Sequence, residues 1–272
     1  MIIDFHTHAF PEKIASRTLE VLRKGSRDVS GIDCIPSTDG TVKGLVELID
    51  CSCVDMAVVL PIATKPEQTE TINRVALEVS EKSGGRLISF GSVHPADPFA
   101  ADAVDRAAEM GIVGLKLHPE FQRIDIDSDG ALAVLRRAAK NKMPVVIHAG
   151  RDIGLPPPVH SSPDMILRAL DAVPELSLIA AHLGGWMMWD EVAKKLCGAP
   201  LYFDTAFISS YIEPAFARDI IRSHSAQKVL FGSDCPWEAP KKTLEFLEKL
   251  GLTDMELSLI KGENAKKLLK IR

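Results

Sequence analysis

Residues 144–150 read PVVIHAG, a short, continuously apolar run that ends in a histidine. A strand with one face in water alternates polar and apolar side chains, whereas continuous apolarity is typical of a strand covered on both faces. The same pattern recurs at 2–8, 55–61, 87–95, 112–119, 176–182, 201–206 and 228–234. The run at 144–150 is therefore one of eight predicted buried strands.

Helical segments separate these strands. Asp97-Pro98 and Ser162-Pro163 each place a capping residue and a first-turn proline before such a segment. The segments 67–83, 130–142, 212–224 and 240–250 have the same helical character. From the second strand onward, strand starts recur every 25 to 32 residues, the length of one strand, one helix and two loops. This alternation predicts an α/β fold, a single (β/α)8 TIM barrel domain over residues 1–272.

The connection after the first strand is longer than one such unit. It has 46 residues between His8 and Asp55. We expect an insertion there, with an extra helix near 11–24, a Gly/Ser/Asp-rich loop at 25–40 and the usual helix at 41–53. The loop either folds over the mouth of the barrel as a lid or lies on the surface, and the sequence leaves both open.

Composition narrows the class of function. The chain has 272 residues, 46% of them hydrophobic, and a net charge of -5 with acidic and basic residues interspersed. Because the sequence shows no basic stripe and no long apolar run, and its start lacks a basic leader with a cleavage site, we expect no nucleic-acid partner, no membrane span and no secretory signal. Five scattered cysteines indicate reduced thiols and a cytoplasmic location. We expect a small-molecule substrate, and a homodimer as the candidate assembly.

Polar residues gather where the predicted strands end. The reactive groups of a (β/α)8 barrel come from the carboxyl ends of its strands. The residues at those ends are His6, His8, His94, Lys116, His118, His148, His182, Asp204 and Asp234. Six of the eight histidines belong to this set, and His160 and His224 lie elsewhere. A functional site is therefore expected at this end of the barrel.

Four of these residues form a candidate metal site. His6 and His8 share one face of the first strand, and strands one, five and eight converge, so His148 and Asp234 are expected beside them. Three imidazoles and a carboxylate suit Zn²⁺, with Mn²⁺ or Fe²⁺ as alternatives, and leave a position for water. We predict that one such ion activates that water, that Asp234 also accepts its proton, and that unligated His182 acts as a general acid or base.

Four further residues are candidate substrate contacts. Lys116 could pair with an acid, bind an anionic substrate or be carbamylated and bridge a second ion. His118 shares its strand face. Arg151 could reach a substrate carboxylate or pair with Asp152, and Trp186 could wall the cavity or only pack against the sheet.

Taken together, these motifs resemble the amidohydrolase superfamily, in the subgroup of metal-dependent hydrolases and decarboxylases related to aminocarboxymuconate semialdehyde decarboxylase. The resemblance rests on DFHTH, GLKLHP, VVIHAG, AAHLGG, YFDTA, LFGSDCPW and GENAKKLL, which occur in this order along the whole chain. It implies one catalytic metal, usually zinc, on His6, His8, His148 and Asp234, with His182 unligated. A rival scheme in the superfamily has a carboxylated lysine bridging two ions, and Lys116, His148 and His182 satisfy that pattern too.

Two reactions are compatible with these residues. The first expectation is hydrolysis of a small ester, lactone or amide by a metal-activated water. The alternative is a metal-dependent decarboxylase acting on an aromatic or enol carboxylate. In that case Lys116 and Arg151 would anchor carboxylates, and the substrate is expected to be anionic. The sequence does not decide between them.

Overall fold

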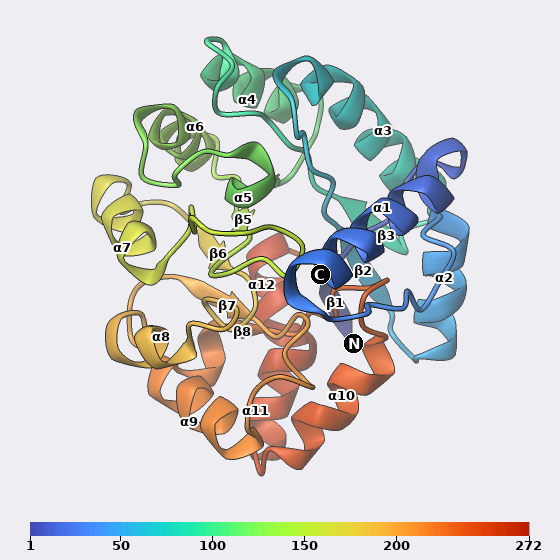
Figure 1. Ribbon diagram of the computed structural model, residues 1–272, viewed down its shortest axis with the longest axis vertical. Coiled ribbons are helices and arrows are strands. Elements are labelled where there is room, and N and C mark those ends of the chain that lie inside the picture. The colour runs from blue at the N-terminus through green and yellow to red at the C-terminus, as the bar shows by residue number, and fades with distance from the viewer. Residues whose placement is uncertain (272) are drawn as a thin grey trace.

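The computed structural model describes residues 1–271, which form eight short parallel strands surrounded by helices (Figure 1). The strands are β1 (Ile3–Thr7), β2 (Met56–Val59), β3 (Leu87–Ser89), β4 (Leu115–Leu117), β5 (Val145–Ile147), β6 (Leu178–Ala180), β7 (Tyr202–Asp204) and β8 (Val229–Leu230). Each strand pairs with the next in parallel within the sheets β1-β2-β3 and β4-β5-β6-β7-β8. This order is the one that the alternation of strands and helices predicts.

Backbone hydrogen bonds join the two sheets at both junctions and close the barrel. Between β8 and β1, Phe5 N donates to Phe231 O at 2.7 Å, and Asp234 N donates to His6 O at 2.8 Å. Between β3 and β4, Gly91 N donates to Gly114 O at 2.9 Å, and Lys116 N donates to Gly91 O at 2.8 Å. The fold is thus the predicted TIM barrel.

The helices lie outside the strands. They are α1 (Glu12–Ser30), α2 (Val42–Cys51), α3 (Thr69–Lys82), α4 (Ala100–Glu109), α5 (Pro119–Gln122), α6 (Asp129–Lys140), α7 (Pro163–Ala172), α8 (Trp189–Lys195), α9 (Pro214–His224), α10 (Pro240–Lys249), α11 (Asp254–Ser258) and α12 (Asn264–Leu269). Short 3-10 turns occur at Pro66–Gln68 and Ala226–Lys228, and a π turn at Leu259–Glu263. No helix within residues 1–271 has both the length and the apolarity that crossing a membrane requires.

Two hydrophobic cores hold the barrel together. An outer core lies between strands and helices and includes Val59, Val145 and Ile147. An inner core fills the barrel and includes Phe5, Val58, Leu60, Phe90, Val146, Ile179 and Leu230. Ala265 of α12 belongs to the inner core, and Leu268 and Leu269 pack against it. Because α12 follows Gly262, which lies against the Met1 carbonyl at the start of β1, it covers the amino end of the barrel.

A register shift in β1 positions the two histidines of this strand. Asp4 pairs with Ala57 and Thr7 with Val59, so three steps along β1 match two along β2. Such a bulge changes which face a strand presents. Phe5 can therefore pack in the inner core while His6 and His8 both face the carboxyl end of the barrel.

The insertion after β1 differs from the expected helix near 11–24 and loop at 25–40. Helix α1 continues to Ser30. Two serine hydroxyls donate hydrogen bonds to carbonyl oxygens one turn earlier within the helix, Ser26 to Arg23 O and Ser30 to Ser26 O. It ends at Gly31, whose φ of 73° is the left-handed stop that glycine adopts easily. In Figure 1 α1 crosses in front of the strands, and the loop that follows it continues across the centre of the view toward α2. Ser26 of the helix and Cys34 of the loop both line the cavity at the mouth of the barrel.

Candidate metal and active site

A cavity of about 610 Å³ opens at the carboxyl ends of the strands. The predicted site residues that line it are His6, His8, Lys116, His118, His148, His182, Trp186 and Asp234. Arg151 does not line it: its side chain is exposed, and its backbone oxygen accepts a hydrogen bond from His148 Nε2 at 3.1 Å. The structure therefore brings together every predicted site residue except Arg151.

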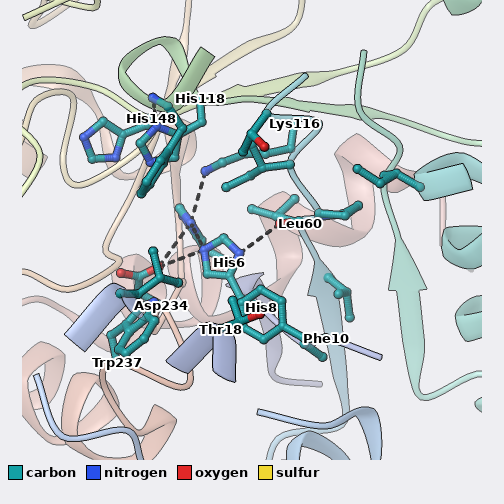
Figure 2. A pocket seen from close by; sticks show the side chains of 18 of the residues that line it. His6, His8, Phe10, Thr18, Leu60, Lys116, His118, His148, Asp234 and Trp237 are labelled. Atoms are coloured by element: carbon teal, nitrogen blue, oxygen red, sulfur yellow. Dashed lines mark hydrogen bonds and ion pairs between the residues drawn. The ribbon is translucent and has the colours of Figure 1, made fainter. Parts of the chain in front are cut away.

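Three atoms that bear lone pairs meet at one point in this cavity. His6 Nε2 and His8 Nε2 lie 3.3 Å apart, and Asp234 Oδ1 lies 3.3 Å from the first and 3.1 Å from the second (Figure 2). The His8 Nδ1–H donates to Leu60 O at 2.8 Å, and the His6 Nδ1–H faces the Asp204 carboxylate at 2.8 Å. With Nδ1 as the donor in each ring, the Nε2 atoms of both imidazoles point toward the carboxylate oxygen. Such a donor set suits a divalent cation.

Asp204 at the end of β7 orients two of the histidines. Its Oδ2 accepts from His6 Nδ1, while its Oδ1 accepts from the backbone amides of His182 at 2.8 Å and Ala206 at 3.0 Å. Burial raises the pKa of this carboxyl, and the backbone amides and nearby charges oppose the rise. An acceptor at this position fixes the tautomer in which His6 Nε2 is free to bind a metal.

His148 lies beside His182 rather than within the group of His6, His8 and Asp234. His182 Nε2 and His148 Nδ1 are 3.0 Å apart. Carbonyl oxygens accept from the outer nitrogens of both rings, Ala206 O from His182 Nδ1 and Arg151 O from His148 Nε2. The inner nitrogens therefore face each other as lone pairs and need a proton or a cation between them. Burial lowers the pKa of His148 well below its usual value, which disfavours a protonated imidazole at this position.

Lys116 places a positive charge next to His6, His8 and Asp234, the candidate metal-ligand group. Its side chain is buried, and Nζ lies 3.2 Å from His6 Nε2. Burial lowers the pKa of this ammonium to about 8, although Asp204 and Asp234 nearby oppose the shift. The same atom is positioned to bind an anion held at the site.

His118 and Asp152 belong to the other side of the cavity. The His118 ring stacks on His148 with centroids 4.3 Å apart, and its Nε2 lies 3.5 Å from Asp152 Oδ2. Its Nδ1 accepts from Phe121 N at 3.4 Å, which caps helix α5. His118 thus holds the His148 ring in place and also faces the cavity.

A comparison of the chain with sequence profiles of protein families identifies its family. The profile described as amidohydrolase matches residues 52–271. The chain belongs to the amidohydrolase family. A comparison with curated protein sequences gave no match.

Solved structures share the fold of this amidohydrolase. A TIM-barrel protein from Bordetella bronchiseptica is 19% identical with a TM-score of 0.79, over 99% of this chain and 98% of the other. A 5-carboxyvanillate decarboxylase from Sphingomonas paucimobilis is 15% identical with a TM-score of 0.72, over 100% and 99%. A dihydroxybenzoic acid decarboxylase from Polaromonas, with bound manganese and the inhibitor 2-nitroresorcinol, is 15% identical with a TM-score of 0.71, over 99% and 97%.

Two features of this amidohydrolase site were not assigned from the sequence. Asp204 stood among the polar strand ends, but the sequence does not show that its two oxygens accept hydrogen bonds from His6 on β1 and from the backbone amide of His182 after β6. The second feature is the left-handed backbone conformation of His182 (φ 59°) and Asp234 (φ 70°). Non-glycine residues in this conformation are uncommon and occur often at functional sites. Both turn their side chains out of the regular strand alternation.

Proposed function

We propose that this amidohydrolase is a divalent-metal-dependent decarboxylase that acts on an aromatic or enol carboxylate. The observation that carries the proposal is Lys116, a buried ammonium beside the ligand group of His6, His8 and Asp234 in an otherwise largely apolar cavity. A carboxylate bound there contacts a cation at one end and apolar side chains elsewhere. Removing water from a carboxylate favours its loss as neutral carbon dioxide.

The residues present fit a divalent ion, and His6, His8 and Asp234 would hold it. His148 remains the predicted fourth ligand. When bound, the ion supplies positive charge that attracts the substrate's oxygens and stabilises negative charge developing during the reaction. Mn²⁺ and Zn²⁺ are the candidates: manganese is bound in the Polaromonas decarboxylase, and two imidazoles with a carboxylate suit zinc.

The chain's own side chains then perform the proton transfer. Lys116 binds and orients the carboxylate, and the indole of Trp186 covers the substrate on the β6 side. As the carbon–carbon bond breaks, its electron pair stays on the ring or enol carbon, and a proton that His182 takes up from solvent moves to that carbon. Carbon dioxide leaves, and no water is consumed.

Trp186 supplies a further donor. Its Nε1 is buried and has no hydrogen-bond partner among residues 1–271. An unpaired buried donor costs about 1–3 kcal/mol, so a ligand oxygen that pairs with it recovers free energy. This donor suits a substrate with a hydroxyl or keto oxygen.

Hydrolysis of an ester, lactone or amide is the second candidate, because Asp234 lies where it could accept a proton from a water in the ligand group. The decarboxylases from Sphingomonas paucimobilis and Polaromonas, which share the fold over almost the whole chain, support the lyase instead. Decarboxylation also gives Lys116 a role that a neutral ester would not require.

The test follows the fate of a labelled carboxyl group. The metal-loaded protein is incubated in D₂O with a panel of ¹³C-carboxyl-labelled hydroxybenzoates, and the products are read by NMR. We expect labelled carbon dioxide and one deuteron on the product carbon. Release of an acid from ester substrates, with ¹⁸O taken up from water and no carbon dioxide from any carboxylate, would refute the proposal.

The variant His182→Asn isolates the proton donor, because asparagine can still donate to Ala206 O. We expect it to lower kcat at least about 100-fold, the usual contribution of general acid catalysis. His160→Gln is the matched control. His160 pairs with Asp125 and does not line the cavity, so this variant is expected to keep full activity.

A further inference from the structure

The cavity is much larger than a single aromatic ring requires. A cavity of about 150 Å³ holds benzene, whereas this one measures about 610 Å³. Cavities of this size accept ligands with several times the volume of a ring. The metal-ligand group occupies only one end, so the remaining volume needs an explanation.

The extra volume lies between helices α1 and α3. Ile14, Thr18 and Leu22 of α1 line it on one side, and Ile72, Val75 and Val79 of α3 line it on the other. We call this part of the cavity the apolar arm. Thr18 lines the same cavity as His6, His8 and Asp234 (Figure 2), so the arm is continuous with the metal-ligand end. Ile14 is 50% exposed, which marks the place where the arm reaches the surface.

The arm extends outside the barrel itself. Val59 lines the cavity, yet it belongs to the outer core between strands and helices, whereas its neighbours Val58 and Leu60 pack inside the barrel. Ala76, on the inner face of α3, is a further lining residue. The cavity therefore passes from the barrel mouth, over the end of β2, into the layer under α3.

Away from the metal-ligand end, the carboxylates that line the cavity are Asp152, beside His118, and Glu67. Among the lining residues of the described chain, Lys116 is the single lysine or arginine. Glu67, which precedes α3, is the one carboxylate on the side of the arm. Because a carboxylate repels another, the arm would bind a second anionic group poorly.

We infer that the substrate is a monocarboxylate with an elongated apolar body, whose single anionic end lies at Lys116 and whose body fills the apolar arm. This inference rests on the proposed function and names its substrate class. It excludes compact dicarboxylates as the preferred ligands. Helix α1, which supplies one wall, thereby becomes part of the specificity site.

Binding of simple alkanoates tests the inference without any need for turnover. The metal-loaded protein is titrated calorimetrically with butanoate, hexanoate, octanoate and decanoate, and with decanedioate. Burying one methylene in apolar surroundings improves binding about fourfold. We expect Kd to fall by about that factor per methylene as the chain lengthens, and decanedioate to bind at least about tenfold more weakly than decanoate. A Kd that is independent of length, or equal binding of decanedioate, would overturn the inference.

Filling the arm should remove this length dependence. Val75→Phe places a ring inside the arm, and Ile72→Phe does so one turn earlier, which provides a second variant if the first unfolds. Glu78→Phe is the matched control, because Glu78 lies on the exposed face of the same helix. We expect either arm variant to abolish the gain from hexanoate to decanoate and the control to retain it. Retention of the full gain in both arm variants would contradict the inference.

These outcomes separate the inference from the proposed function. Length-dependent binding with no carbon dioxide from any carboxylate would refute the decarboxylase and leave the arm as the ligand site. Decarboxylation of a small hydroxybenzoate, together with a Kd that does not change with alkanoate length, would refute the arm and leave the reaction standing.

Discussion

Replacing Asp204 by asparagine should weaken metal binding without removing any ligand. In the structure the carboxylate accepts from His6 Nδ1 at 2.8 Å and from the amides of His182 and Ala206 at 2.8 and 3.0 Å. The amide oxygen of asparagine can still satisfy the two backbone donors. Its NH₂ group then faces His6 Nδ1, where two donors cannot pair. His6 must move its proton to Nε2, the atom that points at His8 and Asp234.

The magnitude follows from the loss of one oriented ligand. Removing the partner that orients a metal-bound histidine typically costs about 10–100-fold in metal affinity, or about 1.4–2.8 kcal/mol. We expect the Kd for Zn²⁺ of Asp204→Asn to rise within this range, measured by competition with a fluorescent chelator at pH 7.5.

Glu238→Gln is the control for loss of a buried carboxylate. Glu238 is also buried and accepts from Ser209 and Thr243, away from the ligand group. Its Kd for zinc should match the wild type. An Asp204→Asn protein that binds zinc as tightly as the wild type would refute the role given to Asp204.

Other predictions concern stability, the aromatic wall and the lysine. The imidazole of His224 is stacked on Phe203, and burial lowers its pKa from 6.5 to about 4. The unfolded chain therefore binds a proton first as pH falls from 6.5 toward 4, and stability should decline by up to about 3 kcal/mol in urea unfolding, with a flatter profile in His224→Gln. Trp186→Phe should leave stability unchanged or slightly higher, because it removes an unpaired buried N–H, while KM rises about five- to tenfold for hydroxylated substrates only. Lys116→Met should raise KM for carboxylates by at least about tenfold with zinc affinity within about twofold of the wild type; loss of zinc would instead favour the lysine-bridged scheme.

The barrel and the grouping of His6, His8 and Asp234 were predictable because both depend on strand order. Continuous apolar runs identify buried strands, and closure places β8 beside β1, which brings Asp234 to His6 and His8. Knowing which strands are neighbours was enough to predict that these three residues lie close together. The prediction used the strand ends alone, and the short strands of the structure leave those ends where the sequence placed them.

Features that depend on register or on the path of an insertion were not predictable. Asp204 looks like any polar strand end until the positions of His6 on β1 and of His182 after β6 are known. Arg151 follows His148 by three residues, but its backbone is tied to Trp186 and His148, and its side chain remains exposed. Helix α1 extends beyond its expected end because Gly25, Ser26 and Ser30, residue types that usually indicate a loop, are accommodated within its last turns.

The apolar arm illustrates the same limit. The sequence shows that α1 and α3 each carry an apolar face, but a helix normally covers such a face by packing against the sheet. Only the path of α1 across the barrel mouth leaves Val75 and Ile72 facing an open cavity instead. Substrate class therefore depends on a three-dimensional arrangement that periodicity does not encode.

Metal content measured by mass spectrometry is the most direct test of the site. Freshly purified wild-type protein and His160→Ala should each contain about one equivalent of a divalent metal per chain, and His8→Ala less than about a tenth. A His8→Ala protein that folds and retains the full equivalent would contradict the assignment of His6, His8 and Asp234 as the metal site.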